Sequence, residues 1–186
     1  MYKVLLVDDE ALIREAISEN TRWKELGYEL MGTCKNGREA MERLDQEEAD
    51  LVLTDICMPY VDGMELTRYL YEHHRGVKVI IISGYDDFEY AKTAVKYQVM
   101  DYILKPITAK ELAQTLTRVK EKLDEERFQK SDMKRIRGAY MSNLPILRGR
   151  FLNSLLMGNV GEQEIQEKLS DYQIKLDGKY FMTALV

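Results

Sequence analysis

The chain has no long apolar run. None approaches the ~20 residues that a helix needs to cross a bilayer. The first residues lead directly into Val4-Leu5-Leu6-Val7, which is too short and wrongly flanked for a secretory signal. These absences argue against a membrane or secreted class, and we expect a soluble, cytoplasmic protein without membrane contact.

Cysteine is also scarce, with two residues in the whole chain. Cys34 and Cys57 stand alone, without a C-x-x-C motif or a histidine at ligand spacing. This pattern argues against a disulfide framework and against a zinc site. We expect both cysteines to be small, buried hydrophobic residues.

The residues that are present suffice for a core. Hydrophobic residues make up 45% of the chain and charged residues 32%, which excludes a disordered tail. The length of 186 residues exceeds the ~100–150 of a typical domain but is short for two. One complete domain with an accessory segment is the expectation.

Charge divides the chain into two parts. Residues 1–107 carry 21 Asp and Glu against 13 Lys and Arg, a net charge of −8. Residues 108–186 carry 11 Asp and Glu against 14 Lys and Arg, a net charge of +3. Because an acidic segment repels a polyanion, we do not expect residues 1–107 to bind nucleic acid.

Short apolar runs alternate with amphipathic stretches over the first 107 residues. The run Val77–Ile82 is almost continuously apolar, which is typical of a strand covered on both faces. The alternation predicts an α/β fold with a five-stranded, parallel, doubly wound sheet. Strands are predicted over Tyr2–Val7, Glu29–Cys34, Leu51–Thr54, Val77–Ile82 and Tyr102–Leu104, and helices from Ala11 and over Gly37–Glu48, Met64–Tyr71 and Phe88–Tyr97.

A long helix is predicted after Pro106. Thr108 and Glu111 have the spacing of a capping box, and no glycine or proline follows before Gly138. Residues 109–137 would form about 43 Å of helix, which is too long to stay within the first domain.

One face of this helix carries a short heptad seam. Part of the same face must also cover the sheet. Glu126 and Lys130 interrupt the seam, so its length predicts a conditional homodimer rather than a constitutive one. We expect this homodimer to form through the linker helix or through a face of the first domain. The seam consists of Leu112, Leu116, Val119 and Leu123, in 4-3-4 spacing.

The last third of the chain predicts an incomplete second domain. Leu144–Gly158 and Glu162–Leu169 have helical patterns, and Lys179–Val186 reads as a strand. The chain stops on this apolar strand, so we expect a fragment of a longer protein. The expected limits are 1–107 for the α/β core, 108–138 for the last helix and linker, and 139–186 for the partial domain.

Polar residues follow four of the predicted strands. Asp8-Asp9-Glu10 follows the first strand, Asp55 the third, Ser83 the fourth and Lys105 the fifth. In a doubly wound sheet these strand ends converge on one crevice. Clustered carboxylates favour a hard divalent cation, above all Mg²⁺, which keeps waters and accepts phosphate oxygens. With a lysine for an anion and a central carboxylate as nucleophile, the implied chemistry is phosphoryl transfer to an aspartate.

These motifs resemble the receiver domain of two-component response regulators. Each motif is weak alone, but all four occur in order at the predicted strand ends. The resemblance implies a flavodoxin-like fold and a signalling domain that is no enzyme beyond its own phosphotransfer and dephosphorylation. It covers residues 2–122 and rests on Val7-Asp8-Asp9-Glu10, Leu53-Thr54-Asp55-Ile56-Cys57-Met58-Pro59 with Asp62-Gly63, Ile82-Ser83-Gly84-Tyr85 and Leu104-Lys105-Pro106.

The resemblance also implies a role for each residue. Asp55 corresponds to the phospho-acceptor. The magnesium ligands correspond to Asp8, Asp9, Asp55 and the backbone carbonyl of Cys57, the phosphate-pairing cation to Lys105, and the switch residues to Ser83 and Tyr102.

Residues 81–107 further resemble the YesN-like subgroup of response regulators, and Leu147–Leu156 resembles the start of its middle region. Members of this subgroup join the receiver through a long helical linker to a variable middle region and a C-terminal AraC-type helix-turn-helix domain. The resemblance implies a sensor histidine kinase as phosphoryl donor. It also implies a transcriptional output in which DNA is bound only by a domain absent from this chain.

Other interpretations stay open at this point. Asp8-Asp9-Glu10 could complement the dipole of a helix N-terminus, and Lys105-Pro106 could be only a strand stop. A haloacid-dehalogenase-like phosphatase also uses an aspartate nucleophile and magnesium, but it needs a second acid two residues later. Asp55 is followed by Ile56-Cys57, which breaks that pattern. A receiver that acts as an adaptor through protein binding alone is the remaining alternative.

Overall fold

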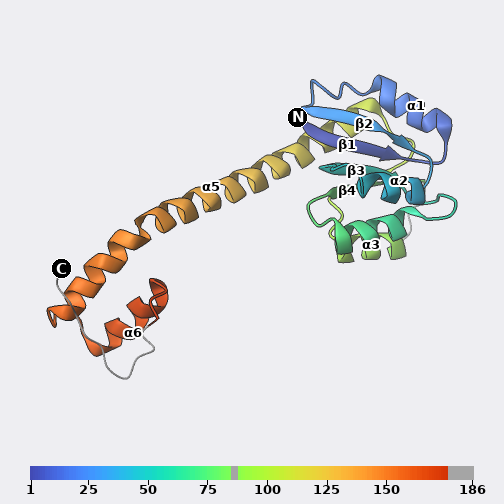
Figure 1. Cartoon of the computed structure of the whole chain (residues 1–186). Helices are drawn as coiled ribbons and strands as arrows, with labels where there is room; N and C mark the ends of the chain where they lie inside the picture. The colour runs from blue at the N-terminus through green and yellow to red at the C-terminus, as the bar shows by residue number, and fades with distance from the viewer. Residues whose placement is uncertain (85–87, 176–186) are drawn as a thin grey trace. The chain divides into compact units, whose positions relative to one another are not determined.

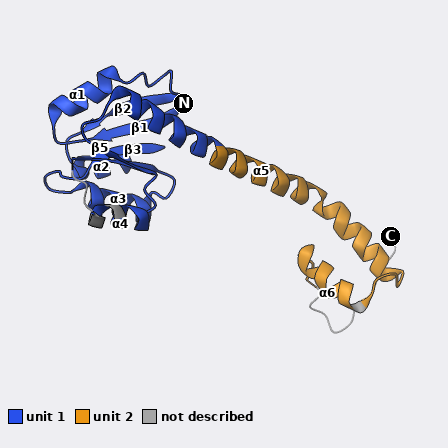
Figure 2. Cartoon of the chain, turned by 180° about the vertical axis from the view of Figure 1, so that it is seen from behind, with its two compact units in different colours: residues 1–124 blue, residues 125–186 orange. Residues whose placement is uncertain are grey.

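The computed structural model describes residues 1–84 and 88–175, which belong to two compact units (Figure 2). Unit 1 comprises Met1–Asp124 and unit 2 comprises Glu125–Val186. The strand predicted over Lys179–Val186 lies outside the described residues. Within those residues, no helix combines the length and the apolar character that crossing a membrane requires.

Unit 1 is built around a five-stranded parallel sheet (Figure 1). The strand order β2-β1-β3-β4-β5 is that of a doubly wound sheet, so the predicted fold class is confirmed. The elements are β1 (Tyr2–Val7), α1 (Ala11–Asn20), β2 (Tyr28–Cys34), α2 (Gly37–Leu44), β3 (Leu51–Asp55), α3 (Gly63–His73), β4 (Lys78–Ser83), α4 (Phe88–Lys96), β5 (Asp101–Leu104) and the first part of α5 (Ala109–Leu156).

Alternate residues of each strand enter two separate cores. In β1, Val4 and Leu6 belong to the core that includes residues of α1 and α5. Leu5 and Val7 belong to the core that includes residues of α2, α3 and α4. Because helices cover both faces, the strands are apolar on both sides, which explains their near-continuous hydrophobic sequence.

The seam predicted for a dimer lies inside unit 1. All four of its leucine and valine residues are in the core shared with α1, and none is more than 7% exposed. The Tyr28 hydroxyl also donates to the backbone carbonyl of Leu116 at 2.9 Å. The sheet therefore uses the whole seam, and the predicted dimer contact through it is wrong. A 4-3-4 spacing marks the apolar face of a helix without saying whether a sheet or a second helix covers it.

The long helix also differs from the expectation at its far end. The sequence predicts an end at Gly138 and a new helix from Leu144, whereas α5 continues from Ala109 to Leu156 with Pro145 inside it. A glycine inside a helix costs only about 1 kcal/mol and a proline about 3 kcal/mol. Leu144 and Phe151 are buried, and we attribute the continuity to this packing.

Unit 2 consists of the end of α5 and the helix α6 (Glu162–Asp171), which was predicted. Two contacts hold the residue after α6 against α5. Nε of Arg148 donates to the backbone carbonyl of Tyr172 at 2.7 Å, and the Phe151 ring meets the Tyr172 ring edge-on at 5.7 Å between centroids. The first contact places a cation at the C-terminus of α6, as the helix dipole favours.

The burial of the seam leads to a stability prediction. Leu116→Ala removes a fully buried side chain and should lower the free energy of unfolding by about 3 kcal/mol. Urea unfolding followed by fluorescence of the single tryptophan, Trp23 in the same core, measures the change. Leu12→Ala is the matched control, because Leu12 is 81% exposed and should change the same free energy by less than about 0.5 kcal/mol. Equal losses in the two variants would show that α5 does not complete the core.

Candidate functional site

Four strand ends bring the predicted residues to one edge of the sheet. Asp8 and Asp9 follow β1, Asp55 is the last residue of β3, Ser83 is the last residue of β4, and Lys105 follows β5. The carboxylate oxygens of Asp8, Asp9 and Asp55 lie within 4.8 Å of one another. Three negative charges at this separation repel, so the edge requires positive charge.

Lys105 supplies one positive charge. Its Nζ donates to Oδ2 of Asp8 at 3.0 Å and to Oδ2 of Asp55 at 3.1 Å. Burial lowers the pKa of the Lys105 ammonium, but the hydrogen bonds and charges of Asp8 and Asp55 outweigh this effect and raise it overall. The lysine is therefore held as a cation. The Lys105-Pro106 peptide bond is cis.

Asp8 is the most deeply buried of the three acids, at 1% exposure. Its Oδ1 accepts a hydrogen bond from the backbone N–H of Glu10 at 2.8 Å. Burial raises the pKa of the Asp8 carboxyl, against the lowering effects of that N–H group and of Lys105. A further cation at this edge would favour the charged form of Asp8.

Asp55 has both carboxylate oxygens fixed. Oδ1 accepts from the backbone N–H of Ile56 at 2.8 Å, and Oδ2 accepts from Nζ of Lys105. The side chain is only 8% exposed. The carboxylate is thus oriented by one backbone donor and one cation, and it lies beside the other two acids.

The loop after Asp55 closes tightly upon it through Gly63. A Cβ at Gly63 would lie 1.9 Å from the backbone carbonyl oxygen of Asp55, and the Gly63 N–H donates to the Ile56 carbonyl at 2.9 Å. Asp62 caps α3 by accepting from the backbone N–H of Glu65 at 2.7 Å. In the sequence, the Asp62-Gly63 pair looks like an ordinary turn. In the structure it caps α3 and sets the close approach of that helix to Asp55.

The two predicted switch residues lie on neighbouring strands. Ser83 is fully buried at the end of β4, and its backbone carbonyl accepts from the Lys105 N–H at 2.7 Å. Tyr102 of β5 is half-buried and packs against the core that includes α2, α3 and α4. The structure therefore ties Ser83 to Lys105 through the backbone and places Tyr102 next to Ile81 in the strand register.

One cysteine departs from the expectation. Cys34 is buried, but Cys57 is exposed because it lies beyond the end of β3, in the loop that leads to α3. Partial burial and the negative charges of Asp55 and Asp62 raise the pKa of the Cys57 thiol. The environment of Cys57 therefore disfavours the thiolate, which is the reactive form of the side chain. Its backbone carbonyl as a magnesium ligand stays a prediction.

Glu10 is a contact that the sequence interpretation missed. Its Oε1 lies 3.4 Å from Nζ of Lys105, although the side chain is 60% exposed. The position of Glu10 directly after Asp8 and Asp9 could have indicated this contact, because it brings a third acid to the same edge of the sheet. Such an exposed pair contributes little by itself, so Glu10 adjusts the local charge rather than fixing Lys105.

The tight approach at Gly63 can be tested by adding one methyl group. Gly63→Ala should lower the free energy of unfolding by about 2 kcal/mol, because α3 must move away from Asp55. Urea unfolding gives the free energy, and the amide NMR shifts of residues 55 and 56 report the displacement. Gly76→Ala is the control, since a Cβ there meets no atom within 4 Å and its effect should be near zero. If the two variants behave alike, the close approach does not position Asp55.

Comparison with known proteins places the receiver motifs in a family. Residues 4–117 match the model of the response regulator receiver domain. The uncharacterized transcriptional regulatory protein YesN of Bacillus subtilis is 39% identical over 119 residues, which are 64% of this chain and 32% of YesN. The transcriptional regulatory protein HptR of Staphylococcus aureus is 38% identical over 129 residues, 69% of this chain and 50% of HptR.

A solved structure agrees with these matches. The REC domain of AraT, a response regulator from Geobacillus stearothermophilus, is 40% identical and has a TM-score of 0.64, covering 68% of this chain and 98% of that domain. The chain spans between about a third and a half of the length of YesN and HptR. The family match includes every residue of the candidate site. The chain belongs to the response regulator receiver domain family.

Proposed function

We propose that this receiver accepts a phosphoryl group on Asp55 and thereby controls a transcriptional output outside the chain. The observation that carries the proposal is the position of Asp55, whose carboxylate lies 3.1 Å from the Lys105 ammonium and next to Asp8 and Asp9. A nucleophile, a counter-charge and a cation-binding acid pair thus meet at one point.

The transfer itself needs little from the protein beyond position and charge. One Asp55 oxygen forms a bond to phosphorus as the phosphorus–nitrogen bond of a kinase phosphohistidine breaks, and the imidazole leaves with the bonding electron pair. Lys105 lies where it can pair with the negative charge of the phosphoryl oxygens. The product is an acyl phosphate, which water later hydrolyses, so the activity is self-catalysed transfer and dephosphorylation.

Mg²⁺ is the cation that this donor set fits. Asp8, Asp9 and Asp55 offer carboxylate oxygens within one 4.8 Å cluster, and Cys57 would add its backbone carbonyl. Hard oxygen donors and few protein ligands suit Mg²⁺, which keeps several waters. When bound, the ion neutralises charge on the phosphoryl oxygens.

The switch would be carried by Ser83 and Tyr102. The Ser83 hydroxyl follows the phosphoryl oxygen, and Tyr102 turns inward, which reshapes the face made by α4 and β5. The backbone bond between Ser83 and Lys105 supports this coupling, because both residues then respond to the same phosphoryl group. A coupling free energy of about 1–3 kcal/mol is ordinary for such a switch.

Partners follow from the family and from the names of its members. A sensor histidine kinase would donate the phosphoryl group. YesN and HptR are named transcriptional regulatory proteins, and this chain covers only part of each, so we assign DNA binding to a further C-terminal domain. Residues 139–186 would begin the middle region before it. Because the linker seam is buried in unit 1, we assign phosphorylation-dependent homodimerisation to the receiver face.

Phosphorylation of Asp55 is directly testable. Incubation with acetyl phosphate and Mg²⁺ should add one phosphoryl mass to the wild-type chain, and Asp55→Asn should abolish this addition because the amide is a poor nucleophile. Intact-mass spectrometry measures the product. The control Asp132→Asn changes a partly exposed acid in unit 2, remote in sequence from the site residues, and should be labelled like the wild type. Full labelling of Asp55→Asn would refute the assignment.

The metal role of Asp9 is tested separately. Asp9→Ala should weaken Mg²⁺ binding by about tenfold or more in a calorimetric titration, because it removes one of three clustered carboxylates. Asp9 is exposed, so the variant should fold like the wild type. Asp132→Ala again serves as the matched control. An unchanged Mg²⁺ affinity in Asp9→Ala would exclude this residue as a ligand.

A further inference from the structure

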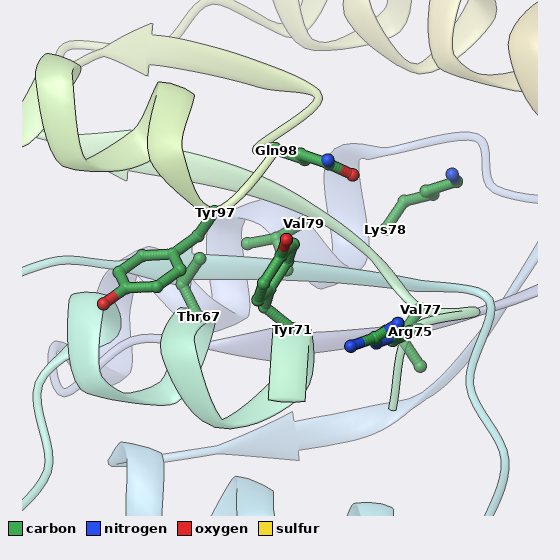
Figure 3. Close-up of a pocket in the computed structure, with 8 residues that line it drawn as sticks. All are labelled: Thr67, Tyr71, Arg75, Val77, Lys78, Val79, Tyr97 and Gln98. Carbon is green, nitrogen blue, oxygen red and sulfur yellow. The ribbon is translucent and has the colours of Figure 1, made fainter. Parts of the chain in front are cut away.

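A second polar pocket lies away from the phosphorylation site. It is formed by α3, the turn after it, the first residues of β4 and the turn after α4 (Figure 3). Asp55 and Ser83 are the last residues of β3 and β4, so they lie at the other end of the sheet. Its volume is about 170 Å³. An apolar cavity of roughly 150 Å³ can hold benzene, so this space matches a ligand of one ring.

Two tyrosines form the aromatic part of the pocket. The ring centroids of Tyr71 and Tyr97 lie 5.7 Å apart at an angle of 56°, and Val79 beside them is 5% exposed. Among the residues that the structure describes, neither tyrosine hydroxyl has a hydrogen-bond partner within the chain. The pocket therefore offers flat apolar surface together with two hydroxyl groups that can bond to a ligand.

Two cations line the other side. Figure 3 shows Tyr97 at one side, Arg75 and Lys78 at the other, and Tyr71 between them. No acidic residue lines the pocket, and Arg75 forms no ion pair in the described part of the chain. The charge of Arg75 thus favours an anion, and a guanidinium suits a carboxylate in particular.

The backbone of Gln98 is strained where its side chain enters the pocket wall. Its φ is +56°, a left-handed conformation that glycine adopts with less strain. The conformation is fixed because the Gln98 N–H donates to the Val95 carbonyl at 3.1 Å and the Val99 N–H donates to the Ala94 carbonyl at 2.9 Å. A side chain kept at a position that favours glycine points to a use for that side chain.

The pocket is also preformed. The backbone N–H of Met100 donates to the Val79 carbonyl at 2.8 Å, which ties the turn after α4 to β4. The N–H of Lys78 donates to the Asp50 carbonyl at 2.9 Å, which fixes the start of β4. Binding would therefore require little ordering of the backbone.

From these features we propose that the pocket binds a small monocyclic aromatic carboxylate. The ring packs against Tyr71 and Val79, and the carboxylate pairs with Arg75. The tyrosine hydroxyls and the Gln98 amide bond to a polar substituent on the ring. The site is separate from Asp55, so the proposal does not depend on phosphorylation.

The first test uses 4-hydroxybenzoate as the probe, with calorimetry for affinity and NMR shifts for location. Binding should shift the amides of residues 67–79 and 97–100. Arg75→Gln should weaken it about tenfold, which corresponds to one charge-assisted hydrogen bond. The control Lys24→Gln removes an exposed cation outside the pocket and should bind like the wild type. No binding at millimolar probe, or equal affinity in Arg75→Gln and the wild type, would overturn the proposal.

Two further comparisons define the ligand class. The neutral 4-hydroxybenzamide and inorganic phosphate should each bind at least about tenfold more weakly than 4-hydroxybenzoate. If phosphate bound as tightly as 4-hydroxybenzoate, the pocket would be a simple anion site and the proposal would be wrong. Gln98→Gly should weaken binding several-fold while the chain unfolds at an equal or higher urea concentration. Unchanged affinity in Gln98→Gly would contradict the use assigned to this side chain.

Discussion

One ammonium group holds the acidic edge of the sheet together. Nζ of Lys105 bonds to Asp8 and Asp55 at once, in a place where the Asp8 carboxylate is 1% exposed. A charge this deeply buried is costly without a partner, and removing one member of such a pair typically destabilises a protein by several kcal/mol, on the order of 3–5 kcal/mol. The same arrangement orients Asp55 and leaves Asp9 exposed. The edge therefore keeps an excess of negative charge, which a divalent cation and a phosphoryl group together would rebalance.

The sheet makes this arrangement possible and connects it to the rest of the chain. Parallel strands deliver every site residue to one edge, and β5, which leads to Lys105, is an outer strand of that sheet. Ile103 of β5 shares a core with Leu112 and Leu116 of α5. A movement of β5 must therefore alter the packing of α5, and α5 runs on into unit 2. This is a physical route by which a change at Asp55 can reach the second unit.

The sequence predicted the sheet and the site because both follow local patterns. Apolar runs marked the strands, and polar residues at their ends marked the crevice.

The length of α5 was missed because Gly138 and Pro145 disfavour a helix locally, and only packing in unit 2 explains why it continues. The sequence did not show that the sheet covers the seam of α5, because the spacing of apolar residues does not identify what packs against a helix face. The role of Gly63 depends on the lack of room for a Cβ beside the Asp55 carbonyl, and the pocket around Tyr71 joins residues of α3 and β4 to the turns beside them. Neither feature leaves a pattern in one segment.

Direct stabilisation between Lys105 and Asp8 can be measured by a double-mutant cycle. The free energy of unfolding is measured in urea, without divalent cations, for the wild type, Lys105→Met, Asp8→Asn and the double variant. We expect a coupling of at least about 1 kcal/mol, because Lys105→Met leaves the buried Asp8 carboxylate without its cation, whereas Asp8→Asn removes one of the two carboxylates that bond to Lys105. A coupling of zero, with the two losses simply additive, would contradict the claim that this ion pair holds the site together.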